Sequence, residues 1–342
     1  MLIREKLEKL EHQILSPYAC FSDQSRGRER AEKECDIRPC FQRDRDRIIH
    51  SKPFRRLKHK TQVFLAPTGD HYRTRLTHTI EVNQIARTIA RALFLNEHLT
   101  EAIALGHDLG HTPFGHAGEY ALNQVHPSGF RHWEQSLRVV EVLANDGAGL
   151  NLTYEVREGI LKHSKGKDSP FLGSGEDFPG TLEGRVVRVA DIIAYVNHDL
   201  EDALRAGLIL KEDIPKELIK TLGETHSQRI NIMVSDLIYS SQNQPQLAMS
   251  EKILQAINQL REWLFEKVYE HPKIRREFDK GIKIVQDLYE YFVNHPEHFL
   301  EISQKKGLKF SLEQEVCDFI AGMSDRYALY IYQQIFIPTS WL

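Results

Sequence analysis

The apolar residues of this chain recur with the period of an α-helix along nearly every long segment. In THTIEVNQIARTIARAL, residues 77 to 93, they form one stripe on a helix. The stretch TEAIALGHDLG adds a helix that begins with Thr100 as N-cap and ends near Gly110. The sequence therefore predicts an all-α fold. Further helices are expected at 131–144, 153–163, 182–206, 250–269, 275–293 and 311–336.

Two segments interrupt the helical period. TQVFLAPTGDHYRTR, residues 61 to 75, has a β-prone start followed by Pro-Thr-Gly-Asp, which predicts a short hairpin or loop insertion. SKGKDSPFLGSGEDFPG, residues 164 to 180, has the composition of a surface loop that could close over a site. We expect an N-terminal arm at 1–40, a catalytic core at 41–206 and a C-terminal helical region at 207–342 packed on that core.

The composition narrows the class of protein. Hydrophobic residues make up 41% of the 342 residues and charged residues 27%, which is typical of a soluble globular chain. A net charge of −3 argues against a protein that coats nucleic acid along a broad face. The start is no secretory signal, and no apolar run could span a bilayer, so we expect a cytoplasmic protein without membrane contact. The four cysteines form no C-x-x-C pair, which indicates free thiols.

Histidines concentrate in one part of the chain, where ten of the seventeen fall between His50 and His132. The densest stretch is GHDLGHTPFGHAGE, residues 106 to 119, which adds an aspartate and a glutamate. His78 lies on the apolar stripe of 77–93, so it points inward and needs a partner. The side chains of consecutive residues on a helix point about 100° apart. His107 and Asp108 can therefore contact the same ligand only if it lies between them, near the helix end.

A further carboxylate lies in RVVRVADIIAYVNHDLEDAL, residues 185 to 204, where Asp191, Tyr195 and Asp199 recur along one strip of an apolar helix. A carboxylate embedded there is costly unless it is paired or bound to a metal. Two imidazoles and two carboxylates suit a divalent ion such as Mn, Fe, Co, Ni, Mg or Zn. The predicted metal ligands are His78, His107, Asp108 and Asp191.

The order His…His-Asp…Asp resembles that of the HD-domain metal-dependent phosphohydrolases. The sequence motifs around these residues are more specific to the family than the His-Asp dipeptide itself. RDRDRIIHSKPFRRLKHKTQVF (43–64), TRLTHTIEV (74–82), GHDLGHTPFGHAGE, ADIIAYVNHDLEDAL (190–204) and GMSDRYAL (322–329) look like the deoxynucleoside triphosphate triphosphohydrolase, or dGTPase-like, branch. The resemblance covers roughly the whole chain. It implies an HD-domain helical fold and a hydrolase that converts a dNTP, for example dGTP, to deoxynucleoside and tripolyphosphate.

The resemblance also implies catalytic roles. His116 and Glu119, at i and i+3, would share one helix face, with His116 as general acid to the leaving 5′ oxygen and Glu119 as its orienting partner. His111 would lie between metal and phosphate, and His132 matches another active-site histidine. Trp133 follows His132, whereas relatives often carry a smaller polar residue at this position. This difference from the family would change the packing of side chains beside the substrate.

Substrate contacts follow from the basic segment 43–60 and from the resemblance. Arginine forks bind phosphate oxygens in pairs, so the segment is predicted to form a socket for a polyanion, with the alternative of a solvated helix face balanced by its own acids. By resemblance, Arg75 would bind a phosphate, Gln62 and Asp199 the sugar 3′-hydroxyl, and Tyr195 the ribose edge. The predicted substrate contacts are Arg47, Arg55, Arg56, Gln62, Arg75, Tyr195 and Asp199.

Two other functions stay open at this point. The chain could be an HD hydrolase of a nucleoside monophosphate, a cyclic dinucleotide or an alarmone. It could also be a nucleotide-binding or single-strand-binding assembly with little turnover, in which the metal is structural. A homo-oligomer is expected from the resemblance, and the C-terminal aromatic residues are compatible with a subunit interface.

Overall fold

A computed structural model describes residues 1–62, 73–164 and 170–338 of the chain, and these residues are mostly helical. Pairing between extended segments within these ranges is limited to two isolated antiparallel bridges, Arg28 with Thr153 and Thr61 with Thr74. The predicted all-α fold is therefore confirmed. In the described ranges, no helix combines the length and the apolar character needed to cross a membrane.

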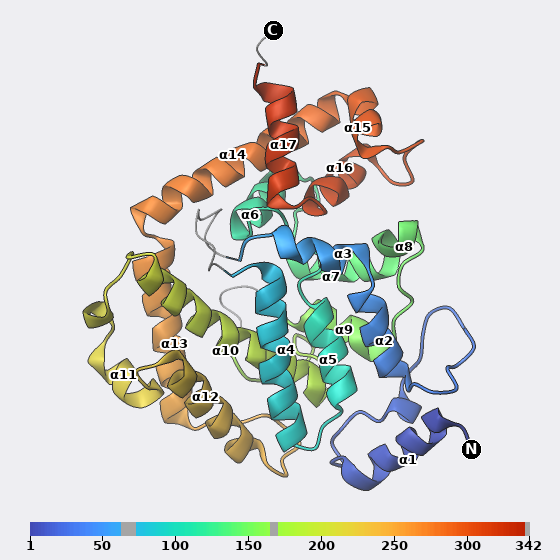
Figure 1. Cartoon of the computed structure of the whole chain (residues 1–342), viewed down its shortest axis with the longest axis vertical. Coiled ribbons are helices and arrows are strands. Elements are labelled where there is room, and N and C mark those ends of the chain that lie inside the picture. Colours follow the sequence, from blue (N-terminus) through green and yellow to red (C-terminus); the bar gives the residue numbers. More distant parts are fainter. Residues whose placement is uncertain (63–72, 165–169, 339–342) are drawn as a thin grey trace.

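The helices are arranged around a central group of three helices, α4, α5 and α10 (Figure 1). The bounds of the helices with at least seven residues are α1 Ile3–Ile14, α2 Cys40–Ile49, α4 Arg75–Ala92, α5 Glu97–Gly106, α6 His116–Val125, α7 His132–Arg138, α9 Tyr154–Lys162, α10 Leu182–Arg205, α11 Lys216–Leu222, α12 His226–Ser241, α13 Glu251–Leu264, α14 Pro272–Asn294, α15 Pro296–Ser303, α16 Leu312–Ala321 and α17 Asp325–Phe336. Shorter elements are α3 Lys52–Arg56, α8 Ala144–Gly147 and the π-helices η3 Val139–Leu143 and η5 Phe265–Tyr269.

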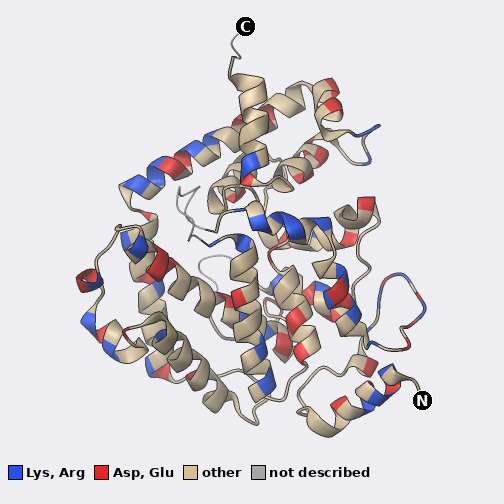
Figure 2. Cartoon of the chain, viewed as in Figure 1, with Lys and Arg blue, Asp and Glu red and all other residues tan. Residues whose placement is uncertain are grey.

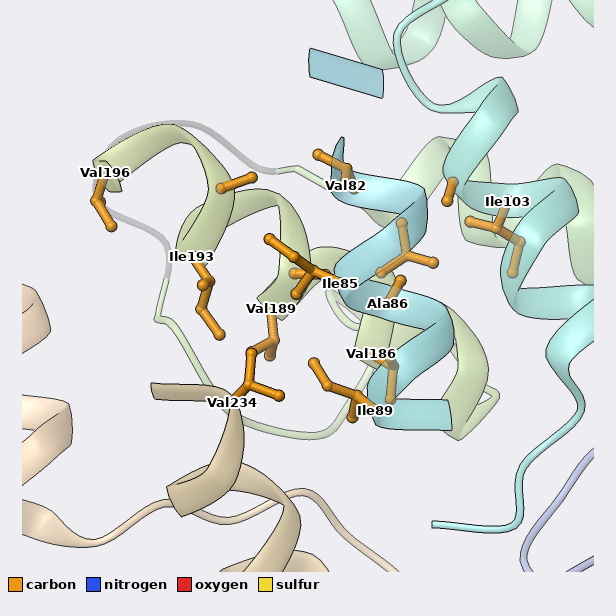
Figure 3. Packing of buried hydrophobic residues seen from close by; sticks show 14 of the residues in the cluster. Val82, Ile85, Ala86, Ile89, Ile103, Val186, Val189, Ile193, Val196 and Val234 are labelled. Carbon is orange, nitrogen blue, oxygen red and sulfur yellow. The ribbon is translucent and has the colours of Figure 1, made fainter. Parts of the chain in front are cut away.

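The central group consists of α4, α5 and α10, which pack on one another through apolar stripes (Figure 1). Val82, Ile85 and Ile89 of α4 are fully buried, as the 77–93 pattern predicts. Figure 3 shows these side chains between Val189 and Ile193 of α10 on one side and Ile103 of α5 on the other. Because the three helices are packed this tightly, polar side chains at their ends are held in fixed relative positions.

A second buried cluster joins α6 to the C-terminal helices α14, α16 and α17 (Figure 1). Ala117 and Leu122 of α6 pack there with Phe292, Phe299 and Ile320. The segment 106–119 therefore begins in the first cluster, at the end of α5, and ends in the second, at α6. The predicted boundary at residue 206 remains a prediction, and the first cluster itself continues as far as Val268.

Three predicted helices differ from the structure. Segment 311–336 is not one helix, because α16 ends at Ala321 and the Ser324 side chain caps a new helix, α17. Segment 131–144 passes from α7 into η3 and then into α8, where Asn145 and Asp146 take left-handed backbone angles. The N-cap of α5 is Asn96 and not Thr100, because the Asn96 side chain accepts hydrogen bonds from the backbone N–H groups of His98 and Leu99.

The segments between the predicted helices also differ in part from the prediction. α11 and α12 were missed, although Thr225 and Gln228 form a capping box at the start of α12 that the sequence carries openly. Thr61 and Thr74, at the two ends of the predicted hairpin or loop, are bridged, and its residues 63–72 lie outside the described ranges. The predicted loop 164–180 contains no helix in its described part, and its residues 165–169 lie outside the described ranges.

Candidate active site

The four predicted metal ligands come together where α4, α5 and α10 meet. His78 extends from α4, His107 and Asp108 follow the last turn of α5, and Asp191 extends from α10. The His78 Nε2 atom lies 3.0 Å from Asp191 Oδ1, and His107 Nε2 lies 3.9 Å from the same oxygen and 3.6 Å from Asp108 Oδ2. The helical packing thus brings together two imidazoles and two carboxylates, which we call the metal cluster.

The state of His107 provides a test of whether a cation fits the metal cluster. Its Nδ1–H donates to the Ala104 carbonyl at 2.6 Å, so Nε2 is the ring nitrogen that remains for another partner. That Nε2 atom is buried, and no residue in the described ranges forms a hydrogen bond with it. A buried imidazole nitrogen without a partner is costly, and it is the atom that a divalent cation would take. Ligand atoms of His78, His107 and Asp108 lie within 4.8 Å of one another, so these residues fit a metal ion.

The carboxylates of the metal cluster are ionised. Burial by itself would raise the pKa of Asp108, but the Arg75 guanidinium at 2.7 Å and the neighbouring histidines hold it well below its usual range. Burial is likewise outweighed at Asp191, where the hydrogen bond from His78 and the proximity of His107 lower the pKa to about 2. Both side chains therefore offer negative oxygens at neutral pH.

Glu119 organises the second part of the motif, which we call the proton-transfer group: His111, His116, Glu119 and His132. The Glu119 carboxylate accepts from His132 Nδ1 at 2.9 Å and from the His132 backbone N–H at 2.9 Å. His116 Nδ1 lies 3.4 Å from its other oxygen, and the His116 side chain is 65% exposed. Glu119 therefore contacts His116 as predicted, and it holds His132 more closely.

The charge of the Glu119 and His132 pair follows from this contact. Burial opposes the charged form of each, but His132 holds the pKa of Glu119 well below its usual range, and Glu119 raises the pKa of His132. His111 stacks on His132 with ring centres 4.6 Å apart. Burial, Arg75 and His132 keep the pKa of His111 well below its usual range, so His111 is neutral.

His163 links the two groups and was missed by the sequence reasoning. Its ring centre lies 5.0 Å from that of His107, and its Nε2 lies 3.3 Å from His132 Nε2. Its Nδ1–H donates to the Ile160 carbonyl. The residue closes the predicted helix 153–163, but nothing in the sequence shows that the end of α9 reaches the motif.

His198 and Glu81 were also missed, and they lie behind the metal cluster. His198 Nδ1 lies 3.5 Å from the second ring nitrogen of His78, and His198 Nε2 lies 3.0 Å from Glu81 Oε2. His78 is thus held between Asp191 on one side and the His198–Glu81 pair on the other. Outer-shell partners of this kind fix the tautomer and orientation of a ligating histidine.

The predicted sugar contacts meet residues from the C-terminal half. The Tyr195 hydroxyl accepts from Arg261 Nε at 2.7 Å, and Asp199 accepts a hydrogen bond from the Tyr269 hydroxyl. Burial raises the pKa of Asp199 to about 6. Arg261 and Tyr269 were not predicted, because they lie in α13 and η5, far along the chain from Asp191.

The predicted phosphate contacts differ among themselves. Arg75 is buried against Asp108 and also donates to the Gln62 carbonyl at 3.3 Å, so both residues lie beside the metal cluster. Arg47 instead donates to the Leu150 and Asn151 carbonyls and pairs with Glu32.

The guanidinium of Arg47 is therefore engaged within the protein, and its role as a substrate contact remains a prediction. Arg55 is exposed on α3, and Arg56 donates to the Gly322 carbonyl at 3.2 Å. Neither arginine forms a described contact with the metal cluster.

Comparison with known proteins gives one consistent result. The sequence matches the model of the HD domain over residues 75–196 and that of the phosphohydrolase-associated domain over residues 247–334. Deoxyguanosinetriphosphate triphosphohydrolase-like proteins are similar along nearly the whole chain. The one from Caldanaerobacter subterraneus subsp. tengcongensis is 57% identical over 345 residues, covering 100% of this chain and 98% of the relative. That from Desulfatibacillum aliphaticivorans is 52% identical over 348 residues, covering 99% of each chain.

Among solved structures, a hypothetical protein from Aquifex aeolicus is similar with a TM-score of 0.48 and 18% identity, covering 86% of this chain and 71% of that one. This likeness is too distant to inform on the site.

Proposed function

The chain belongs to the family of deoxyguanosinetriphosphate triphosphohydrolase-like HD-domain proteins, and on this premise we propose that it hydrolyses a dNTP to deoxynucleoside and tripolyphosphate. The resemblance inferred from the motifs is thus confirmed at the level of the family. The observation that carries the proposal is the buried His107 Nε2, which has no hydrogen-bond partner among the described residues and lies near the carboxylates of Asp108 and Asp191.

His78, His107, Asp108 and Asp191 would hold the divalent cation. Such an ion supplies Lewis-acid polarisation of a phosphoryl oxygen and lowers the pKa of water. Arg75, whose guanidinium is fixed by Asp108, would bind an oxygen of the α-phosphate. Its pairing with a buried carboxylate supports a fixed orientation, because little side-chain entropy remains to be lost when the substrate binds.

The proton-transfer group would complete the reaction. Water attacks the α-phosphorus, the bond from phosphorus to the 5′ oxygen breaks, and His116 donates its proton to that oxygen. Glu119 would orient His116, and its shorter contacts to His132 support a role for His132 in holding the carboxylate. His111, neutral and stacked on His132, would lie against the phosphate.

The sugar would lie along the strip of α10. Asp199 and Gln62 would bind the 3′-hydroxyl, and Tyr195 would pack against the ribose edge, where it leaves no room for a 2′-hydroxyl. The hydrogen bond from Arg261 to the Tyr195 hydroxyl supports this role, because it holds the phenol ring in one place. We further propose manganese as the working metal, a homo-oligomer as the working form, and action in the cytoplasm.

Product analysis tests the proposal. Purified protein is incubated with each of the four dNTPs and the matching NTPs, in the presence of several divalent metals including Mn²⁺. Tripolyphosphate and deoxynucleoside are expected from a dNTP, in equal amounts. If every dNTP yields only pyrophosphate or orthophosphate, the assignment fails, and a panel of nucleoside monophosphates, cyclic dinucleotides and alarmones would then identify another HD-type substrate.

A further inference from the structure

A small cavity adjoins the backbone that directly follows His107 and Asp108. Its volume is about 250 Å³, and its wall includes Leu109 and Gly110, which directly follow Asp108. None of the metal-cluster residues, and none of the proton-transfer group, lines it. Lys52, Arg56 and Lys60 do line it. Part of the basic segment predicted to hold a polyanion thus surrounds a space separate from the metal cluster.

Lys60 is the most unusual residue of this wall, because its ammonium group is buried without a carboxylate partner among the described residues. It donates to the carbonyls of His111 and Ala321, which use two of its three N–H donors. A buried charge that is not paired is costly. Burial lowers the pKa of Lys60 to about 7, and an anion beside it would restore the charged form.

Arg56 lies on the same wall and is also without an acidic partner in the described ranges. Among the described residues its guanidinium forms a single hydrogen bond, to the Gly322 carbonyl at 3.2 Å, which leaves most of its five N–H donors without a partner there. Figure 2 shows the concentration of basic residues on α3, to which Arg56 belongs. Two cations therefore converge on one cavity, one from α3 and one from the segment that follows it.

The other charged residues of the wall are balanced within the protein. Lys305 pairs with Glu315, and Asp318 pairs with Arg138. Lys52 pairs with Asp146 on the left-handed turn of α8, and both side chains are largely exposed. Exposed pairs of this kind are weak, so an incoming anion can replace Asp146 at Lys52. The charge left uncompensated is that of Lys60 and Arg56.

We propose that this cavity binds a small inorganic oxyanion, orthophosphate or pyrophosphate, through Arg56 and Lys60 with Lys52 at its edge. The volume supports a small ligand, because pockets for drug-sized ligands start at about 300 Å³. The position of the cavity links it to the candidate active site. Lys60 is bonded to the backbone carbonyl of His111, so an anion held by Lys60 is linked directly to a member of the proton-transfer group.

Isothermal titration of the full-length protein with orthophosphate and with pyrophosphate, at constant ionic strength, tests the site. Two variants change the cavity in different ways: Arg56→Gln removes a charge, and Leu143→Trp fills the space from the π-helix side, at a residue outside the metal cluster. Lys58→Gln is the matched control, because Lys58 is an exposed cation of the same segment that does not line the cavity. We expect each cavity variant to weaken binding at least tenfold and the control to change it less than twofold.

Two results would overturn the proposal. Equal affinity of Leu143→Trp and the natural protein would put the anion elsewhere, including the metal cluster. Tighter binding of a nucleoside monophosphate than of pyrophosphate, lost in the same variants, would mean that the cavity recognises a nucleotide and not a free oxyanion. Neither result depends on whether dNTPs are hydrolysed, so this proposal and the proposed function can fail separately.

Discussion

The metal cluster and the proton-transfer group adjoin in one motif, yet they are built differently. The side chains of His78, His107 and Asp108 are at most 5% exposed, and they are fixed by three helices of the first buried cluster. His116, by contrast, is 65% exposed and starts α6, whose apolar face belongs to the second buried cluster. The two groups are connected by a few residues and by His163, which contacts both His107 and His132.

This difference separates binding from turnover. A metal site requires fixed ligands, whereas a proton donor must meet a substrate that arrives from solvent, and so the metal ligands are held in the helix core while His116 is open to solvent. Substitutions in the metal cluster should therefore remove metal binding and activity together. Substitutions in the proton-transfer group should reduce turnover and leave metal affinity intact.

The largest effect is expected from Asp108→Ala. The variant loses a metal ligand and leaves the buried Arg75 without its partner, which costs about 3–5 kcal/mol in the free energy of unfolding. We expect no measurable Mn²⁺ binding by calorimetry and no turnover. Asp279→Ala, which changes an exposed carboxylate, is the control. Since Asp108→Ala could unfold, Asp191→Asn provides a second variant, and Mn²⁺ affinity retained by a folded Asp191→Asn protein would contradict the site.

Glu119→Gln should have the next largest effect and should reduce turnover without changing metal binding. Loss of the carboxylate leaves His116 and His132 without their charged partner, and kcat should fall about 100-fold, as is typical of general acid–base catalysis. Mn²⁺ affinity should stay within about twofold, since Glu119 is not in the metal cluster. Glu134→Gln, beside His132 and exposed, is the control. A parallel fall in metal affinity would show that the two groups are not separable.

The same substitution has a pH signature. Glu119 has a pKa lowered from 4.5, so its contribution to stability is present above pH 4.5 and is lost as pH falls through the lower folded value. His132 has a pKa raised from 6.5, so its contribution is present below pH 6.5 and is lost as pH rises through the higher folded value. Denaturant unfolding should therefore show the largest difference between Glu119→Gln and the natural protein from pH 4.5 to 6.5.

His198→Gln should weaken the metal cluster from behind. Because His198 contacts the second ring nitrogen of His78 and pairs with Glu81, its loss frees the orientation of that ligand. Mn²⁺ affinity should fall about tenfold. His226→Gln is the matched control, since His226 stacks on His198 without a described contact to His78. Unchanged affinity in His198→Gln would restrict the metal site to its four ligands.

The sequence predicted the metal cluster better than its surroundings for a physical reason. His78 and Asp191 lie on apolar stripes, and a polar residue on such a stripe is conspicuous because it must be buried. His163, His198 and Glu81 carry no such signal: His163 follows the end of a helix, and the other two depend on the packing of α10 against α4. For Arg47 the sequence shows the charge but not the bonds to Leu150, Asn151 and Glu32.

The helix boundaries show the same limit. The apolar period of 311–336 continues across Gly322, so period alone does not reveal that Ser324 caps a new helix. The turn at Asn145 and Asp146 also interrupts no apolar pattern, although it shapes the wall of the proposed anion cavity. Side-chain caps and left-handed residues are local features, and they decide geometry that the periodicity of the core does not encode.

A stability effect of the opposite sign is expected from Asp199→Asn. Burial raises the pKa of Asp199 from 3.8 to about 6, so ionising it in the folded protein costs of the order of 3 kcal/mol above pH 6. This cost grows as pH rises from 3.8 to 6 and is absent below pH 3.8, where the carboxyl group is protonated in both states. The variant should thus be more stable than the natural protein at pH 8 and equal to it near pH 3.5, by denaturant unfolding.

Asp279→Asn, at an exposed site, should show neither change. If Asp199→Asn is more stable and also loses kcat/KM for a dNTP, the buried carboxylate reduces stability in order to serve the substrate. If stability rises while kcat/KM is unchanged, Asp199 does not contact the sugar, and the strip of α10 beyond Tyr195 lies outside the site.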